Sequence, residues 1–192
     1  LCEDGWDLQH QYYGFSYFRI STHNIVNKHW RYVPVQRYVD PYFPILSSVW
    51  GHNDRDAINM NLILRFITSY EPYQFKGNVG DFPLTLSYGK KADALREKYR
   101  SYLWDAEFRD TQEASVTTED GSAHYPYAVY NRDDGKQGIV MANLTDAPVT
   151  VTARLDKGVT SFLLATPEAP EAVPVGDCIT IRPRGLVLLM EE

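Results

Sequence analysis

Residues 137–155, QGIVMANLTDAPVTVTARL, contain two runs of alternating side chains separated by turn residues. The first run covers 137–145, the second covers 148–155, and an Asp-Ala-Pro turn lies between them. Alternating apolar and polar residues, broken by Asp and Pro, are typical of antiparallel strands joined by a turn. The stretch therefore predicts two strands of an antiparallel β structure.

The same pattern extends from Glu107 to the end of the chain. Asp133-Asp134-Gly135 and Asp156-Lys157-Gly158 supply further turns. This number of short strands suits a small β-sandwich, which we assign to a domain at 106–192. The expected strands are 125–131, 137–145, 148–155, 159–166, 177–183 and 186–190.

The first half of the chain is different material, because all four tryptophans and most tyrosines precede residue 105. Apolar side chains at helical spacing predict a helix over 53–71, capped by Asn53 or Asp54 and ended by Pro72. A second helix is expected over 83–104, with Asp81 as its cap and a long loop over 72–82 before it. Ile45–Val49 is the clearest strand, and the order of strand, aromatic loop, strand and helix indicates βα units with long loops.

Composition excludes several classes of function. The formal net charge is -6 and the charges are scattered, so we expect neither a nucleic acid nor a membrane surface as partner. No apolar run is long enough for a spanning helix. The two cysteines, Cys2 and Cys178, lack the spacing of a metal site, and we expect them to be buried thiols. Phosphate-loop, GxSxG and HExxH motifs are absent, so no cofactor and no metal are predicted.

Three stretches, 81–110, 138–147 and 179–189, together resemble the C-terminal part of glycoside-hydrolase-like proteins of gut bacteria. Those proteins have a (β/α)₈ catalytic barrel followed by an antiparallel sandwich. The resemblance implies that 1–105 is a partial (β/α) barrel segment of about two βα units with long aromatic loops and two helices. It also implies O-glycosyl hydrolysis by a carboxylate pair in the intact protein, with a carbohydrate as substrate or ligand.

The size of the first domain limits what the chain does alone. A (β/α)₈ barrel needs roughly 250 residues, and about 200 is the practical minimum. Residues 1–105 cannot close one, so we expect the chain to be part of a longer, catalytically competent protein and to be inactive alone. We also expect it to form homo-oligomers or to associate with the missing barrel portion, because open sheet edges pair readily. A signal on the longer protein would make it secreted or periplasmic.

The candidate site residues lie in two loops that follow expected strands. Glu3 and Asp4 come directly after Leu1-Cys2 and are the candidate catalytic carboxyl groups, since glycosidic hydrolysis uses such a pair at strand ends. The alternative is that these acids are simply solvated. Aromatic and polar side chains nearby suit sugar faces and hydroxyl groups, although packing and helix capping are competing roles. The candidate substrate-binding residues are Trp6, Asp7, His10, Trp50, His52 and Asp54.

A second interpretation stays open, namely a non-catalytic carbohydrate-binding or structural module whose aromatic first half forms a sugar platform. Barrel remnants would place neighbouring strands parallel and adjacent, whereas such a module would have an antiparallel, closed core.

Overall fold

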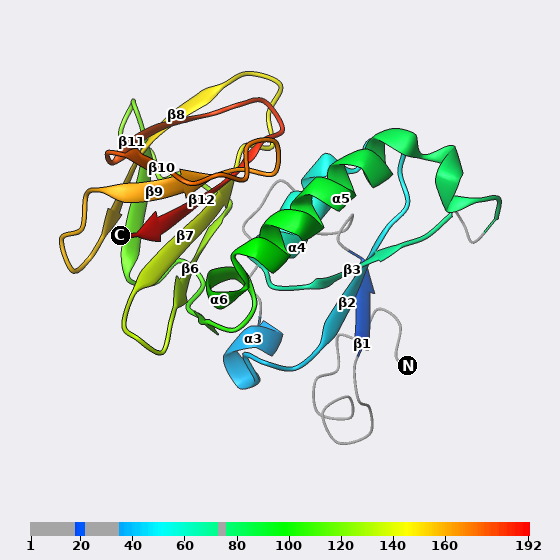
Figure 1. Ribbon diagram of the computed structural model, residues 1–192, viewed down its shortest axis with the longest axis horizontal. Helices are drawn as coiled ribbons and strands as arrows, with labels where there is room; N and C mark the ends of the chain where they lie inside the picture. The colour runs from blue at the N-terminus through cyan, green and yellow to red at the C-terminus, as the bar shows by residue number, and fades with distance from the viewer. Residues whose placement is uncertain (1–17, 22–34, 73–75) are drawn as a thin grey trace. The chain divides into compact units, whose positions relative to one another are not determined.

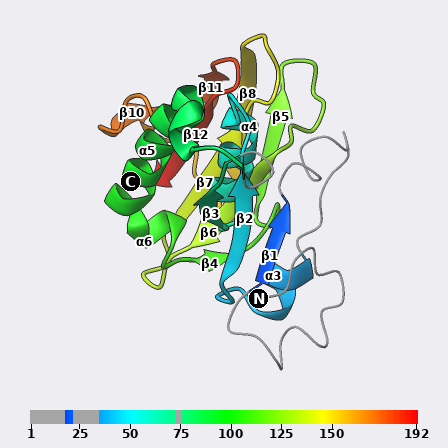
Figure 2. The same cartoon turned by 90° about the vertical axis from the view of Figure 1, so that its right-hand side faces the viewer.

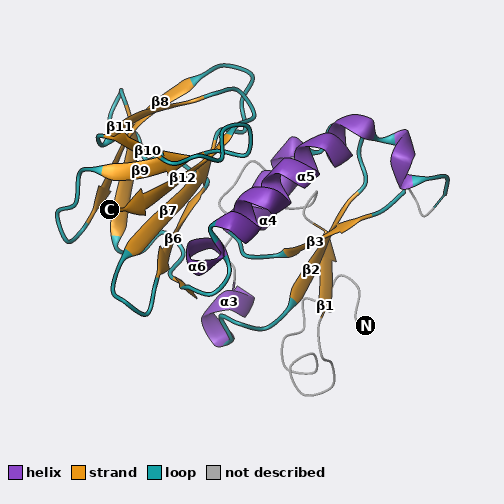
Figure 3. Cartoon of the chain, in the orientation of Figure 1, coloured by secondary structure: helices purple, strands orange, loops and turns teal. Residues whose placement is uncertain are grey.

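A computed structural model describes residues 18–21, 35–72 and 76–192, and these residues are mostly β-sheet with few helices (Figure 3). The chain divides into two compact units, residues 1–90 and 91–192, and the boundary falls within helix α5 (Pro83–Lys98). Within the described ranges, no helix has the length and apolar character that crossing a membrane requires.

Unit 1 is built on a three-stranded sheet in the order β1-β2-β3, whose bounds are Phe18–Ser21, Ile45–Val49 and Ile67–Tyr70 (Figure 1). Both pairings are parallel. Helix α3 (Val35–Val39) precedes β2, and helix α4 (Arg55–Ile63) connects β2 to β3. Parallel strands joined through a helix are the arrangement expected of βα units.

The core of unit 1 forms where α4 packs on the sheet. Strand β2 has the predicted bounds, and Ile45 and Val49 are buried at its two ends. Apolar side chains of α4 and of the turn after it complete this core. They are Ala57, Ile58, Met60, Leu62, Ile63, Leu64 and Phe66.

The helix predicted over 53–71 is wrong in its second half, because α4 ends at Ile63 and β3 follows. Arg65 adopts φ 58°, which turns the chain out of the helix. The N–H of Phe66 then donates to the carbonyl of Asn61 (2.8 Å), and that of Arg65 donates to Leu62 (3.3 Å). These two bonds form a Schellman motif with arginine where glycine is usual. The β-branched residues after it then continue as a strand.

The second helix begins as predicted at Pro83 but is divided in two. Helix α5 covers Pro83–Lys98, and α6 (Arg100–Leu103) follows after Tyr99. The preceding stretch is not wholly loop, since η2 (Val79–Asp81) is a single 3₁₀ turn. Asp81 closes a capping box with Asn78 at this turn, so it caps η2 rather than α5.

Unit 2 contains two antiparallel sheets (Figure 2). The six-stranded sheet has the order β10-β9-β12-β7-β6-β4, and the three-stranded sheet has the order β11-β8-β5. All six strands predicted by alternation are confirmed, and three short ones were missed. In chain order the strands are β4 (Glu107–Phe108), β5 (Ala114–Thr118), β6 (Tyr127–Asn131), β7 (Gln137–Ala142), β8 (Val149–Leu155), β9 (Phe162–Ala165), β10 (Val173–Val175), β11 (Cys178–Ile181) and β12 (Leu186–Glu191).

Alternate side chains of both sheets meet in one apolar core, as in a sandwich. The six-stranded sheet contributes among others Ile139, Met141 and Leu189, and the three-stranded sheet contributes Val151 and Ile179. Their outward neighbours on β8 and β11 are more exposed, which is the period-2 pattern from which the strands were predicted. The expectation of a buried thiol at Cys178 is wrong, because this side chain lies on an outward position of β11 and is exposed. Cys2 lies outside the described residues.

His124 is a largely buried ionisable residue of unit 2. The ring is 8% exposed, and its Nε2 lies 2.9 Å from the carbonyl oxygen of Ala142. Burial lowers the pKa of His124 below its ordinary value, although the hydrogen bond to Ala142 opposes this. The unfolded chain therefore binds a proton at a higher pH than the folded chain does.

We expect the free energy of unfolding to fall as pH drops from about 6.5 towards the lower pKa of folded His124, and to lose this dependence below it. Urea unfolding at a series of pH values measures the effect. In His124→Gln this part of the pH dependence should disappear, and an unchanged pH profile in that variant would contradict the assignment.

Candidate functional site

The carboxyl ends of β2 and β3 form the candidate site of unit 1. Val49 pairs with Tyr70 in the parallel register, and the N–H of Glu71 extends the pairing by donating to the carbonyl of Val49 (3.0 Å). Trp50 and Glu71, the residues that follow the two strands, both line one narrow crevice, which is too small to admit a water molecule. This edge is where parallel α/β structures place functional side chains.

The Glu71 carboxylate is held by two serine hydroxyls from neighbouring strands. Its Oε1 accepts from Ser69 Oγ at 2.8 Å and from Ser48 Oγ at 3.2 Å. The two serines are partners in the β2–β3 register, so both hydroxyls lie on the same side of the sheet. Two donors on one oxygen fix the orientation of the carboxylate before any ligand arrives, which is the kind of preorganisation that functional groups need.

Asp54 fixes the loop that carries Trp50. Its Oδ2 accepts from the backbone N–H of Trp50 (2.9 Å) and from that of Gly51. Thr85 on α5 closes the other side, accepting from the Asp54 N–H (2.9 Å) and donating to the Gly51 carbonyl (2.6 Å). A side chain at Gly51 would not fit, since an added Cβ would lie 2.6 Å from Asp54 Cγ.

The structure describes three of the predicted site residues, namely Trp50, His52 and Asp54, and places them in different environments. Trp50 is half-buried in the lining of the crevice. Asp54 precedes α4 but makes no side-chain capping bond to it, so the predicted cap is replaced by the bonds to Trp50 and Gly51. His52 is exposed, and its ring makes an edge-to-face contact with the ring of Phe82, with 5.0 Å between the ring centroids. The other predicted site residues lie outside the described residues, namely Glu3, Asp4, Trp6, Asp7 and His10.

Sequence reasoning missed the residues that accompany Trp50, which are Glu71, Ser48 and Ser69. Glu71 and Ser69 were missed because 67–71 was assigned to the long helix. Ser48 lies in the predicted strand Ile45–Val49, and its role depends on the position of Glu71. Two signals were available, namely the strand-favouring run Ile67–Tyr70 and Pro72, which disfavours helical backbone at the residue before it. Over the ranges that the structure describes, no group of three or more His, Cys, Asp or Glu side chains could hold a metal ion.

Asp54→Ala is expected to lower the free energy of unfolding by about 1–3 kcal/mol, because it leaves the N–H groups of Trp50 and Gly51 without their acceptor. Urea unfolding followed by tryptophan fluorescence measures the change. The matched control is Asn53→Ala at the exposed neighbouring position, which should stay within about 0.5 kcal/mol of the parent. Equal stability of the two variants would contradict the role given to Asp54.

Comparisons with known proteins find only low similarity in sequence and structure. No protein-family model matches the sequence, and no curated protein matches it. Among solved structures, a GH27 β-L-arabinopyranosidase from Geobacillus stearothermophilus in complex with arabinose is 14% identical with a TM-score of 0.42, and the match covers 74% of this chain and 31% of that one. A candidate α-galactosidase/melibiase from Bacteroides fragilis is 11% identical with a TM-score of 0.39, covering 73% and 28%.

A candidate α-N-acetylgalactosaminidase from Bacillus halodurans is 13% identical with a TM-score of 0.36, covering 69% of this chain and 29% of that one. The chain thus spans about three tenths of the length of each of these structures. At these TM-scores the likeness assigns neither a common fold nor an activity.

Proposed function

We propose that the chain is part of a glycoside-hydrolase-like protein, in which β1, β2 and β3 belong to a (β/α)₈ barrel and unit 2 is an accessory sandwich. The observation that carries the proposal is that Trp50 and Glu71 follow two paired strands and line the same crevice at the carboxyl edge of a parallel sheet. An indole face and a fixed carboxylate are what a sugar site needs, because sugars present an apolar ring face and a rim of hydroxyls.

In this proposal Trp50 stacks on a sugar ring and Glu71 accepts hydrogen bonds from its hydroxyls. Hydrolysis of a glycosidic bond generally requires two carboxyl groups, one acting as acid and the other as base or nucleophile. Glu71 is one candidate for such a group, and Glu3 and Asp4 remain candidates for the other. Among the described residues the parallel sheet has three strands, which are too few to close a barrel, so the proposal places the rest of the catalytic set outside the described residues.

Hydrolysis of a panel of aryl glycosides by the 192-residue chain and by a version extended upstream tests the proposal. We expect turnover only in the extended protein, and a loss of at least about a hundredfold in its Glu71→Gln variant. Trp50→Ala should raise KM more than it lowers kcat, since stacking acts on binding. Asn53→Ala, at an exposed position outside the crevice lining, is the control.

Turnover by the 192-residue chain alone would contradict the incomplete catalytic set. An extended protein that binds oligosaccharides through Trp50 without hydrolysing any of them would replace the proposal with the carbohydrate-binding module.

We also propose that the chain alone self-associates through unit 1. Among the described strands, β1 and β3 each pair on one side only, which leaves hydrogen-bonding groups of the parallel sheet open. Multi-angle light scattering after gel filtration should give a mass above the 22.1 kDa of one chain. A monodisperse monomer at the same concentration would contradict this expectation, and addition of the upstream segment should restore a monomer.

A further inference from the structure

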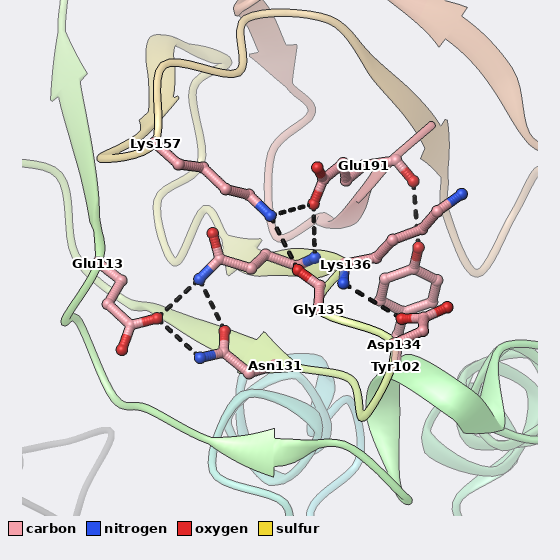
Figure 4. Close-up of polar contacts among 9 residues, drawn as sticks. Tyr102, Glu113, Asn131, Asp134, Gly135, Lys136, Lys157 and Glu191 are labelled. Atoms are coloured by element: carbon pink, nitrogen blue, oxygen red, sulfur yellow. Dashed lines mark hydrogen bonds and ion pairs between the residues drawn. The ribbon is translucent and has the colours of Figure 1, made fainter.

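Unit 2 carries an open polar groove that the proposed function does not use. Its volume is about 450 Å³, within the range of roughly 300–1,000 Å³ of small-ligand sites. It lies beside the hairpin of β6 and β7 and beside the turn that follows β8 (Figure 4). Most of its lining residues carry polar or charged groups, and they include Glu107, Asn131, Arg132, Gln137, Asp156 and Lys157.

The amide of Gln137 presents a hydrogen-bond acceptor to this groove. The residue is 7% exposed, and its Nε2 donates to Glu113 Oε2 (2.7 Å) and to Asn131 Oδ1 (2.8 Å). Both amide protons are thereby used. Within the described part of the chain, Oε1 accepts no hydrogen bond, and it remains accessible to solvent. A largely buried side chain thus keeps one unpaired oxygen at the groove.

Glu113 fixes the orientation of the Gln137 side-chain amide. Its carboxylate accepts from Arg109 Nε (2.8 Å) and from Asn131 Nδ2 (2.7 Å). The hydrogen bond from Asn131 lowers the pKa of Glu113, while burial opposes that shift, so the group stays ionised at neutral pH. An ionised carboxylate only accepts, so a flipped Gln137 would place oxygen against oxygen. The acceptor at the groove is therefore fixed.

Lys157 supplies a donor in the lining of the same groove. Its Nζ donates to the carbonyl of Gly135 (3.0 Å) and pairs with Glu191, which itself accepts from the backbone N–H of Gln137 at 2.8 Å (Figure 4). An ammonium group has three protons, so one remains for a ligand. Asp156, the preceding residue, adds an exposed carboxylate.

We propose that this groove binds a small neutral polyhydroxylated molecule, a mono- or disaccharide, through Gln137 Oε1, Lys157 Nζ and the Asp156 carboxylate. A hydroxyl group both donates and accepts, so neighbouring hydroxyls match an array of fixed acceptors and a donor. Carboxylates and cations occur together in the lining, so it attracts neither strong anions nor strong cations. The site lies entirely in unit 2 and does not depend on the function proposed for unit 1.

The test is a titration of the whole chain with D-glucose, D-galactose, D-xylose and cellobiose, followed by ¹H–¹⁵N NMR of the Gln137 side-chain amide. We expect saturable shifts with a dissociation constant on the order of 1 mM, as for a few hydrogen bonds that replace bonds to water. Lys157→Met and Asp156→Ala should each weaken binding by about tenfold. The matched control is Lys136→Met, an exposed lysine that does not line the groove, and its affinity should stay within about twofold of the parent.

Absence of saturable shifts with all four sugars would overturn the proposal. So would binding that Lys157→Met and Asp156→Ala leave unchanged, or binding of glucose 6-phosphate in preference to glucose. A Trp50→Ala variant separates the two sites, because it should keep the Gln137 shifts whether or not the site in unit 1 binds sugar.

Discussion

Arg37→Met is expected to lower the free energy of unfolding by about 3–4 kcal/mol. Arg37 lies on α3 with its side chain 2% exposed. Its Nε donates to the carbonyl of Leu64 (3.0 Å), Nη1 donates to that of Phe43 (2.6 Å), and Nη2 donates to that of Arg65. One guanidinium thus joins α3 and the loop before β2 to the end of α4.

The physical reason is the position of those carbonyls. The last carbonyl groups of a helix have no intrahelical donors, and they carry the negative end of its dipole. Arg37 supplies both the hydrogen bonds and the positive charge. Methionine fills similar space but leaves these carbonyls buried without partners. Lysine should recover only part of the lost stability, because all its N–H donors are on one nitrogen and cannot reach carbonyls in several directions.

Urea unfolding measures the total change, and hydrogen exchange at the Phe66 amide reports it locally. That amide closes the Schellman motif, so its protection should fall by more than about a hundredfold. The control is Lys90→Met on the exposed face of α5, expected within about 0.5 kcal/mol of the parent. A loss below about 1 kcal/mol for Arg37→Met would show that the carbonyls find water instead.

Asn143→Ala is expected to cost unit 2 about 2–4 kcal/mol. Asn143 follows β7 and is 1% exposed. Its Nδ2 lies 2.6 Å from the carbonyl of Ala147 and 3.3 Å from that of Ile181, and its Oδ1 accepts from the backbone N–H of Thr145 at 2.8 Å. The amide thereby holds the turn between β7 and β8 against the end of β11.

Asn143→Asp distinguishes the two halves of this amide. It keeps the acceptor for Thr145 but loses the donor and brings a negative charge towards carbonyl oxygens, so it should be at least as destabilising as alanine. Thr145→Ser keeps the hydroxyl that also reaches Asn143 Oδ1 and should change stability by less than about 0.5 kcal/mol. Thermal unfolding of the three variants gives the order of their stabilities, and a nearly neutral Asn143→Ala would contradict the role assigned here.

The burial of Asn143 also bears on glycosylation. Asn143-Leu-Thr matches a glycosylation sequence, but the buried Asn143 side chain is not accessible in the folded unit.

The strands of unit 2 were predictable because their signal is local. Strand β8 alternates between buried and more exposed residues, whereas β7 and β12 are nearly continuous buried runs. Both patterns lie within a single element and are bounded by turn residues, so each strand can be recognised from its own sequence. Strand β5 and strand β10 were not predictable in this way. Both are edge strands, and each pairs with a single partner, β8 or β9.

The candidate site was predictable only on the β2 side. Trp50 follows the clearest strand of the first half, so its place at a strand end could be inferred from the sequence. Glu71 required the end of α4 to be located, and that depends on the left-handed backbone of Arg65, a conformation that the sequence does not announce. The contacts of Arg37 with the end of α4 join residues 27 and 28 positions apart, which no local pattern encodes.

The hydrogen bonds from Trp50 and Gly51 to the Asp54 carboxylate restrict which residues positions 51 and 54 can carry together. Because the Asp54 carboxylate occupies the space of a Cβ at Gly51, the two positions are coupled. Alanine at 51 would push the Asp54 carboxylate out of its place, and then the Trp50 N–H loses its acceptor. Distant relatives that keep the indole in this orientation should therefore carry glycine and aspartate together, three positions apart, and this pair offers a sharper search pattern than the overall identity does.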